Sequence, residues 1–305
     1  MPEKIKLKTH LKIFLLKFLK KISNYSKFIN NKIRFMIYGL VTVPNLEIHI
    51  AHGCNLSCVS CSHYSDQNHK GVLSLEEFQD SLKLWKNKIF PEIFTLLGGE
   101  PAINKNLPHF LELARQHFPR AHLRLITNGF LLDRHPTLPA VMKMVGNASL
   151  ILSIHHDSIE YQDKLKVVNK LLEQWINHFG ITVQKWPSNN FWTKRYHGKG
   201  LHFLPFDDGN PEVSWEICPA KYCLQLFEGK IWKCPPLAYL KLQNEKYSLH
   251  SSWDYYLKYQ PIESSCTKHQ LQEFISRKAE TYCGMCPSKQ HFFAMPNPLR
   301  GSIVQ

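Results

Sequence analysis

Three cysteines, Cys54, Cys58 and Cys61, lie within eight residues, directly after the strand-like run of residues 46–50. A cubic [4Fe-4S] cluster takes one thiolate per iron, and a short loop wrapped around it can supply three of the four. Structural zinc sites use four protein ligands, usually in two separated pairs, and an odd triplet in one loop cannot pair off as disulfides. The spacing therefore predicts an iron–sulfur cluster whose fourth iron is open to a ligand.

Two further motifs follow in order. Residues 93–101 read IFTLLGGEP, and residues 123–129 read LRLITNG. With the cysteine triplet they resemble the radical S-adenosylmethionine (SAM) enzymes. The resemblance implies that the open iron binds SAM and that four residues of these motifs contact it. They are Gly98, Gly99, Glu100 and Asn128. Two glycines let the backbone approach a ligand closely, and the Glu100 carboxylate can accept hydrogen bonds from the SAM ammonium. The chain departs from the family at Ser60, where an aromatic residue usually precedes the third cysteine.

From residue 46 onward, strand-like and helix-like segments alternate, which favours a parallel sheet or barrel. Ser74 opens one predicted helix, with Glu77 placed to complete a capping box. The expected strands are 46–50, 93–97, 123–126, 149–154 and 181–185, with a sixth at 199–204; the expected helices are 74–86, 106–117, 140–145 and 159–179. The predicted fold class is α/β, a partial (β/α)5-6 TIM-like barrel with a small C-terminal iron-sulfur module. All three motifs fall at carboxyl ends of strands, where such barrels place their chemistry. In the family the end of the fourth strand contacts SAM, so Ser153 and His155 are expected contacts.

The alternation stops beyond residue 186, and the remaining chain holds six of the nine cysteines. Cys218 and Cys234 flank a Gly229 turn, and Cys283 and Cys286 form a close pair. This pattern resembles the Twitch domain, the short form of the SPASM domain, and implies that these four thiols hold an auxiliary [4Fe-4S] cluster. Cys223 competes with Cys218 as a ligand, and Cys266 is expected to be a spare buried thiol. Four cysteines in two groups would also suit structural zinc.

Net charge is concentrated at the amino terminus, because residues 1–40 hold ten Lys or Arg and one acid. Apolar residues recur there at helical spacing, which is typical of a basic helix on an anionic membrane, on a partner, or on the barrel itself. Nucleic acid is disfavoured, since nothing there reads bases. No apolar run reaches the roughly 20 residues of a membrane span, and no signal cleavage site follows, so we expect a cytoplasmic protein. The expected domains are 1–45 (basic extension), 46–210 (barrel), 211–292 (auxiliary-cluster domain) and 293–305 (tail).

The resemblance implies reductive cleavage of SAM to a 5′-deoxyadenosyl radical that abstracts hydrogen from a substrate, with electrons from a donor such as flavodoxin or ferredoxin. A four-cysteine auxiliary cluster has no free iron for substrate, which favours electron transfer and net oxidation. We expect a hydroxylated, sugar-like small molecule as substrate, because residues 1–45 are too few for a leader-peptide-binding domain. A peptide-modifying maturase is the alternative, and a zinc-binding interaction module without catalysis is an alternative of another class. Six aromatic residues could stack on a sugar or simply pack the domain interface: Trp186, Phe191, Trp192, Tyr196, Phe203 and Phe206.

Overall fold

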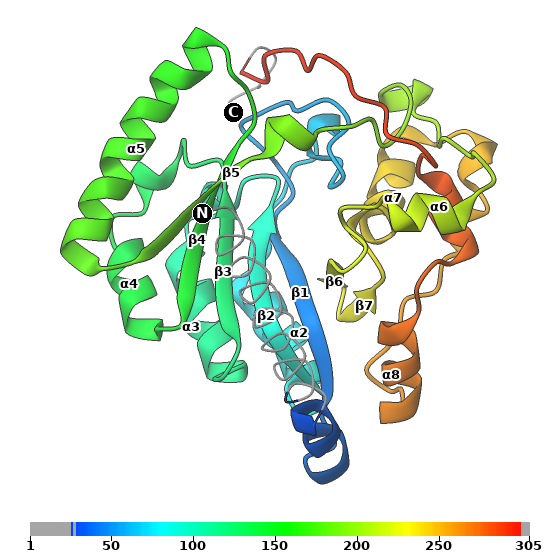
Figure 1. The fold of residues 1–305 in the computed structure, drawn as a ribbon, viewed down its shortest axis with the longest axis horizontal. Helices are drawn as coiled ribbons and strands as arrows, with labels where there is room; N and C mark the ends of the chain where they lie inside the picture. Colours follow the sequence, from blue (N-terminus) through cyan, green and yellow to red (C-terminus); the bar gives the residue numbers. More distant parts are fainter. Residues whose placement is uncertain (1–25, 27–28, 300–305) are drawn as a thin grey trace, which may run out of the picture.

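The structure is a computed structural model that describes residue 26 and residues 29–299. Its centre is one seven-stranded sheet in the order β5-β4-β3-β2-β1-β6-β7 (Figure 1). All neighbours pair in parallel except β6 and β7, which are antiparallel. The strands are β1 (Val41–Ala51), β2 (Ile89–Gly98), β3 (His122–Thr127), β4 (Ala148–Ile154), β5 (Thr182–Pro187), β6 (Leu224–Phe227) and β7 (Lys230–Trp232).

Helices connect the parallel strands, as right-handed βαβ units require. They are α2 (Leu75–Trp85), α3 (Leu107–His117), α4 (Leu138–Val145) and α5 (Ile159–Phe179), with α6 (Pro211–Glu216), α7 (Pro235–Tyr247) and α8 (Lys268–Ser276) in the C-terminal part. The predicted capping box is confirmed: Ser74 Oγ accepts the Glu77 N–H at 3.1 Å, and Glu77 Oε2 accepts the Ser74 N–H at 2.9 Å. The expected α/β partial barrel is likewise confirmed, as an open sheet.

The sixth parallel strand is not where the sequence suggested. Residues 199–204 form a 3-10 turn at Gly200–His202, and Gly198 and Gly200 adopt positive φ angles that interrupt an extended chain. The sixth strand is instead β6, which pairs with β1 at Leu46 and Glu47. The sheet of the barrel therefore continues into the region that carries the C-terminal cysteines.

The turn predicted at Gly229 is confirmed, and it joins β6 and β7 in an antiparallel hairpin. Glu228 and Gly229 form its turn with φ angles of 52° and 69°, the left-handed pair that two-residue hairpin turns favour. Cys223 stands just before β6 and Cys234 just after β7. The hairpin therefore fixes both thiols at the end of the sheet.

The last described residues run back across the carboxyl ends of the strands towards α5 (Figure 1). The Ser57 N–H donates to the Pro298 carbonyl at 3.0 Å, and Lys194 N–H donates to the His291 carbonyl at 3.0 Å. This segment therefore contacts the loop that carries the first three cysteines.

Residues 29–37 form a helix that projects from the amino end of β1 (Figure 1). The Arg34 guanidinium lies 3.8 Å from the centroid of the Phe90 ring, and the Phe35 ring meets His269 edge to face. Met36 and Ile37 are exposed. The rest of the expected basic helix lies outside the described residues. Within the described residues, no helix has the length and apolar character to cross a membrane.

Candidate active site

Cys54, Cys58 and Cys61 lie in the loop after β1, and all three line one cavity of about 320 Å³. None is in a disulfide. Burial raises the pKa of Cys61 to about 11, and the neighbouring thiols help to raise the pKa of Cys58. Because metal ligation replaces these protons, the three thiols fit an iron–sulfur cluster bound at the cavity wall.

The same cavity is lined by Gly98, Gly99, Asn128, Ser153 and His155, so five of the six predicted SAM contacts face the space beside the thiols. They stand at the carboxyl ends of β2, β3 and β4. This is the edge at which open parallel sheets bind ligands.

The two glycines also have a packing role that the sequence did not reveal. A Cβ on Gly98 would lie 2.2 Å from the Ala51 carbonyl oxygen, and one on Gly99 would lie 2.2 Å from that of Gly53. The Gly99 and Glu100 N–H groups donate to these same carbonyls, both at 2.9 Å. The glycines therefore let the end of β2 bond directly to the start of the cysteine loop.

Glu100 is placed differently from the other predicted contacts, because it is fully buried and does not line the cavity. Its carboxylate accepts hydrogen bonds from the Thr127 hydroxyl at 2.5 Å, the Asn128 N–H at 2.8 Å and the Ala102 N–H at 3.0 Å. Burial raises the pKa of this carboxyl to about 7. In this structure Glu100 joins the ends of β2 and β3, with its hydrogen-bonding capacity directed into the protein.

Asn128 and His155 reach the cavity from β3 and β4. The Asn128 amide donates to Asn55 Oδ1 at 2.7 Å and lies 3.9 Å from the Cys54 sulfur, so it orients the first residues of the cysteine loop. His155 Nδ1 is buried and has no hydrogen-bond partner, and burial lowers the pKa of the imidazole to about 4. A buried polar atom without a partner at a cavity wall is available to a ligand. The hydroxyl groups of Ser153 and Ser188 form a hydrogen bond of 2.7 Å.

The departure at Ser60 has a structural counterpart. Ser60 has a φ of 67°, and its hydroxyl accepts the Arg195 N–H at 2.6 Å. Next to it, the Trp192 indole N–H donates to the Val59 carbonyl at 2.8 Å. Trp192 lines the cavity. An aromatic side chain from a later segment therefore stands beside the cysteine loop, although position 60 itself is small.

The predicted aromatic platform divides into a cavity-lining pair and a buried pair, while Phe191 is exposed and Phe206 packs against the His197 and His291 rings. Trp186 and Trp192 line the cavity. Tyr196 and Phe203 are buried in a ring cluster with Tyr64 and Trp253, and the Tyr196 hydroxyl donates to Asp66 at 2.7 Å. The second group packs the interface between barrel and C-terminal part.

Four of the C-terminal cysteines influence one another's pKa values: Cys218, Cys234, Cys283 and Cys286. The other three all act on the Cys234 thiol to raise its pKa, together with burial, and Cys218 and Cys283 act likewise on Cys286. Burial, the Glu47 carboxyl and the Cys218 thiol all raise the pKa of Cys223, whose sulfur lies 3.8 Å from the Asn45 amide nitrogen. Cys266 lies apart from the set, beside Lys88. These are the four thiols that the Twitch resemblance implied, and their ligation of a cluster stays a prediction.

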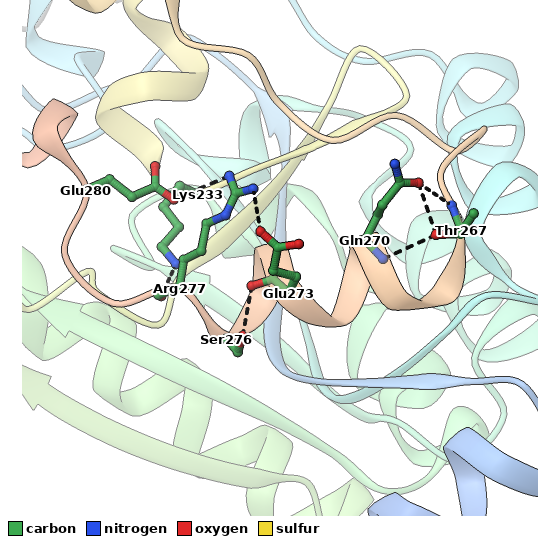
Figure 2. A network of polar contacts seen from close by, with 7 residues as sticks. All are labelled: Lys233, Thr267, Gln270, Glu273, Ser276, Arg277 and Glu280. Carbon is green, nitrogen blue, oxygen red and sulfur yellow. Dashed lines mark hydrogen bonds and ion pairs between the residues drawn. The ribbon is translucent and has the colours of Figure 1, made fainter.

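A polar network holds the segments that carry these thiols (Figure 2). The buried Lys233 ammonium donates to the Arg277 carbonyl, while the Arg277 guanidinium contacts Glu273 at 3.3 Å and Glu280 at 3.9 Å. Lys233 precedes Cys234, and Glu280 precedes Cys283. The network thus joins the end of β7 to the chain between α8 and the last two cysteines.

Within the described residues, no three or more His, Cys, Asp or Glu side chains are grouped so that they could hold a single metal ion. Several cavity-lining residues were not assigned to the cavity from the sequence, among them Glu47, His63, Asp66 and Cys223. Glu47 could have been found, because polar residues alternate with apolar ones along residues 46–50 and so share one face of the strand.

The family model described as "Radical SAM superfamily" matches residues 48–188. Among curated relatives, a GTP 3′,8-cyclase of Campylobacter fetus subsp. fetus is 31% identical over 100 residues, and one of Campylobacter curvus is 35% identical over 101 residues. Each match covers 32% of this chain and 30% of the relative, so the chain spans about a third of their length. Among solved structures, a crystal structure of BtrN in complex with AdoMet and 2-DOIA aligns over 82% of this chain and 97% of that one. The sequence identity is 13% and the TM-score is 0.45. Residues 48–188 therefore belong to the radical SAM superfamily, whose enzymes use a [4Fe-4S] cluster and SAM.

Proposed function

We propose that this protein is a radical SAM oxidoreductase that oxidises a hydroxylated, sugar-like small molecule. One observation carries the proposal: three loop thiols line a cavity that is also lined by five residues of the SAM-binding motifs and strand ends. Four further thiols in the C-terminal part raise one another's pKa values, which supports a second group of ligands. The first group suits a cluster with an open iron, and the second suits a cluster with none.

In this proposal Cys54, Cys58 and Cys61 hold the SAM-binding cluster. Gly98, Gly99, Asn128, Ser153 and His155 contact SAM, and Glu100 supports them by fixing the ends of β2 and β3. When bound, the cluster and SAM supply a 5′-deoxyadenosyl radical that removes a hydrogen atom from the substrate. The chain itself orients the ligands and limits water in the cavity, where Trp186 and Trp192 form an apolar wall.

Cys218, Cys234, Cys283 and Cys286 would hold the auxiliary cluster. Bound there, it would supply an acceptor for the electron that the substrate loses after hydrogen abstraction, with the hydroxyl proton passing to solvent, so that the substrate is oxidised overall. The cysteines come from residues 211–292, the proposed auxiliary-cluster domain, and residues 46–210 are the proposed barrel. A small reduced flavodoxin or ferredoxin supplies the first electron. The matched relatives bear the name GTP 3′,8-cyclase, and GTP is therefore the competing substrate to test.

Metal content is the primary test of this proposal. Iron, sulfide and zinc are measured per chain after anaerobic reconstitution, in the native protein and in a Cys54→Ala, Cys58→Ala, Cys61→Ala variant. We expect about eight irons in the native protein and about four in the variant. About four irons falling to none would remove the auxiliary cluster and the argument for oxidation. Zinc without iron in both proteins would leave only a zinc-binding module.

Activity is scored on the same samples. Dithionite-reduced native protein should cleave SAM to 5′-deoxyadenosine, detected by mass spectrometry, and the triple variant should not. Addition of GTP tests the cyclase reaction directly, and a GTP-derived product would replace the oxidoreductase proposal. The Cys266→Ala variant is the matched control, because that thiol lies apart from both groups.

A further inference from the structure

A row of polar side chains crosses the inner face of the sheet at one level. Glu47 on β1 pairs in register with Thr95 on β2, Thr95 with Arg124 on β3, and Arg124 with Ser149 on β4; on its other side Glu47 pairs with Gln225 on β6. Partners in register point to the same face of a sheet. Glu47, Thr95, Ser149 and Gln225 are all buried. Polar groups at this depth are unusual in a sheet core and require partners.

Glu47 is the member of this row that reaches the cavity. Its Oε1 accepts a hydrogen bond from the Asn45 amide at 2.7 Å, and its Oε2 accepts one from the Gln225 amide at 2.7 Å. The amides are themselves held, by Thr95 at 2.8 Å and by the Tyr239 hydroxyl at 3.0 Å. The Glu47 carboxyl is thus fixed in one orientation by side chains from three strands and α7.

Cys223 lies beside Glu47 and lines the same cavity. Its thiol contacts the Glu47 carboxyl and the Asn45 amide. The residue that the sequence left as a competing cluster ligand therefore belongs to the wall of the cavity.

The hydrogen-bonding capacity of the Glu47 carboxylate is not exhausted. A carboxylate has about four acceptor positions, and the chain supplies donors from Asn45, Gln225 and Cys223. Two strands away, on the order of 10 Å at the usual strand spacing, the Arg124 Nε is buried and has no partner. The Arg124 guanidinium lies 5.6 Å from the ring centroid of Trp186, which lines the cavity. The inner face of the sheet therefore offers an acceptor at one side and unused donor capacity at the other.

We propose that Glu47 and Cys223 form a substrate subsite that binds a hydroxyl group of a small polyhydroxylated molecule, with Glu47 accepting the hydrogen bond. The subsite rests on the proposed function and names the part of the cavity that selects its substrate. Loop thiols at the carboxyl ends of the strands and Glu47 further down β1 lie at different depths of one cavity, so the subsite is set apart from the thiols. Burial raises the pKa of Glu47, because a charged carboxylate loses hydration there. This environment favours a neutral hydroxyl group as the partner of Glu47 over a charged group.

Binding of myo-inositol, a cyclic polyol, tests the subsite. Saturation-transfer NMR titrations use the full-length, anaerobically reconstituted protein with SAM present. We expect myo-inositol to bind the native protein, and Glu47→Gln to weaken its affinity at least about tenfold, because the variant loses a charged acceptor. Ser149→Ala is the matched control: it lies in the same buried row but not at the cavity, and it should bind within about twofold of native. No binding by the native protein, or equal binding by Glu47→Gln, would overturn the subsite.

A second variant protects the test against a folding defect in Glu47→Gln. Cys223→Leu, at the residue before β6, fills the same end of the cavity and leaves the Glu47 side chain in place. It should also abolish saturation transfer, and retained binding would count against the proposal. Each variant is checked for its thermal unfolding midpoint, iron content and substrate-free SAM cleavage. Native protein that cleaves SAM but does not bind the polyol would refute the subsite alone. Polyol binding that depends on Glu47 without SAM cleavage would refute the proposed function and leave the subsite.

Discussion

The two groups of thiols are built in opposite ways. Cys54, Cys58 and Cys61 come from one loop of eight residues, placed by the end of β1. Cys218, Cys234, Cys283 and Cys286 come from three segments that span nearly seventy residues and are joined by the β6–β7 hairpin and the Lys233–Arg277–Glu280 network (Figure 2). The first group depends on local sequence, whereas the second depends on tertiary structure. Substitutions should therefore affect binding and chemistry in the first group, and folding as well in the second.

Loss of one thiol from the first group should have the largest effect. Cys58→Ala removes one of only three ligands, so we expect no detectable SAM cleavage, a loss of at least about a hundredfold. The thermal unfolding midpoint of the metal-free protein should change little. Product is measured by mass spectrometry after dithionite reduction. Residual cleavage above a tenth of native would show that the loop does not hold the cluster.

Loss of one thiol from the second group should separate the two sites. Cys234→Ala should lower bound iron by about four per chain and lower the unfolding midpoint of the reconstituted protein, because the cluster joins distant segments. Substrate-free SAM cleavage should persist. Cys223→Ala, next to the same hairpin, should keep full iron content. Equal iron loss in both variants would restore Cys223 as a ligand.

Gly99→Ala tests the backbone contact between the two first motifs. The added Cβ would lie 2.2 Å from the Gly53 carbonyl oxygen, so β2 or the cysteine loop must move, at a cost on the order of 2 kcal/mol in unfolding free energy. Gly284→Ala, between cysteines of the second group, meets only the Tyr256 hydroxyl at 3.4 Å and should cost less. Urea titration of the metal-free proteins measures both. Equal losses of unfolding free energy in the two variants would mean that the cysteine loop moves with little strain.

The pH dependence of stability should report Glu100. Its pKa is raised from 4.5 to about 7 in the folded protein, so the folded state binds the proton more tightly than the unfolded state. Proton binding by Glu100 therefore contributes most to the unfolding free energy below pH 4.5. This contribution falls as pH rises from 4.5 to about 7, and above that range the unfolding free energy no longer changes with pH because of Glu100. Glu100→Gln should flatten that slope in urea titrations of metal-free protein. Glu77→Gln is the control, because hydrogen bonds lower the pKa of that exposed carboxyl and its contribution is lost at low pH instead.

The smallest effects should come from the two capping boxes, one in each region. Ser74 caps α2 and Thr267 caps α8 with the same pair of reciprocal bonds (Figure 2 for Thr267). Each Ala substitution should lower the unfolding free energy by about 1 kcal/mol. If Thr267→Ala also releases iron while Ser74→Ala does not, α8 contributes to the second group of thiols beyond its own stability.

Local signals predicted the parts of this molecule that local structure determines. Four features depend on residues close in sequence: the strand–helix alternation, the Ser74 capping box, the Gly229 turn and the cysteine loop. The expected strand at 199–204 was wrong, because two glycines in left-handed conformations favour a turn there. The contact of Cys223 with Asn45 of β1 joins residues 178 positions apart in sequence, and no spacing rule reveals it.

Glu100 and Glu47 show the same limit for single side chains. A carboxylate after two glycines indicates a ligand contact, but its orientation depends on Thr127 and Asn128 of another strand. Alternation along β1 could have placed Glu47 on an inner face. Only the register with β6 shows that Gln225 fixes it there.

The pairing of β6 with β1 has a practical consequence for work with fragments. A chain ended at residue 210 would lack the neighbour of Leu46 and Glu47 and would leave the middle of β1 as an open sheet edge. Unpaired, apolar edges associate with other copies of the same chain. An isolated barrel would therefore be expected to aggregate, visible as high-mass species in light scattering, whereas the natural outer edges are short or carry Lys185 and Pro187. The C-terminal part thus covers the β1 edge of the sheet in addition to holding its own thiols.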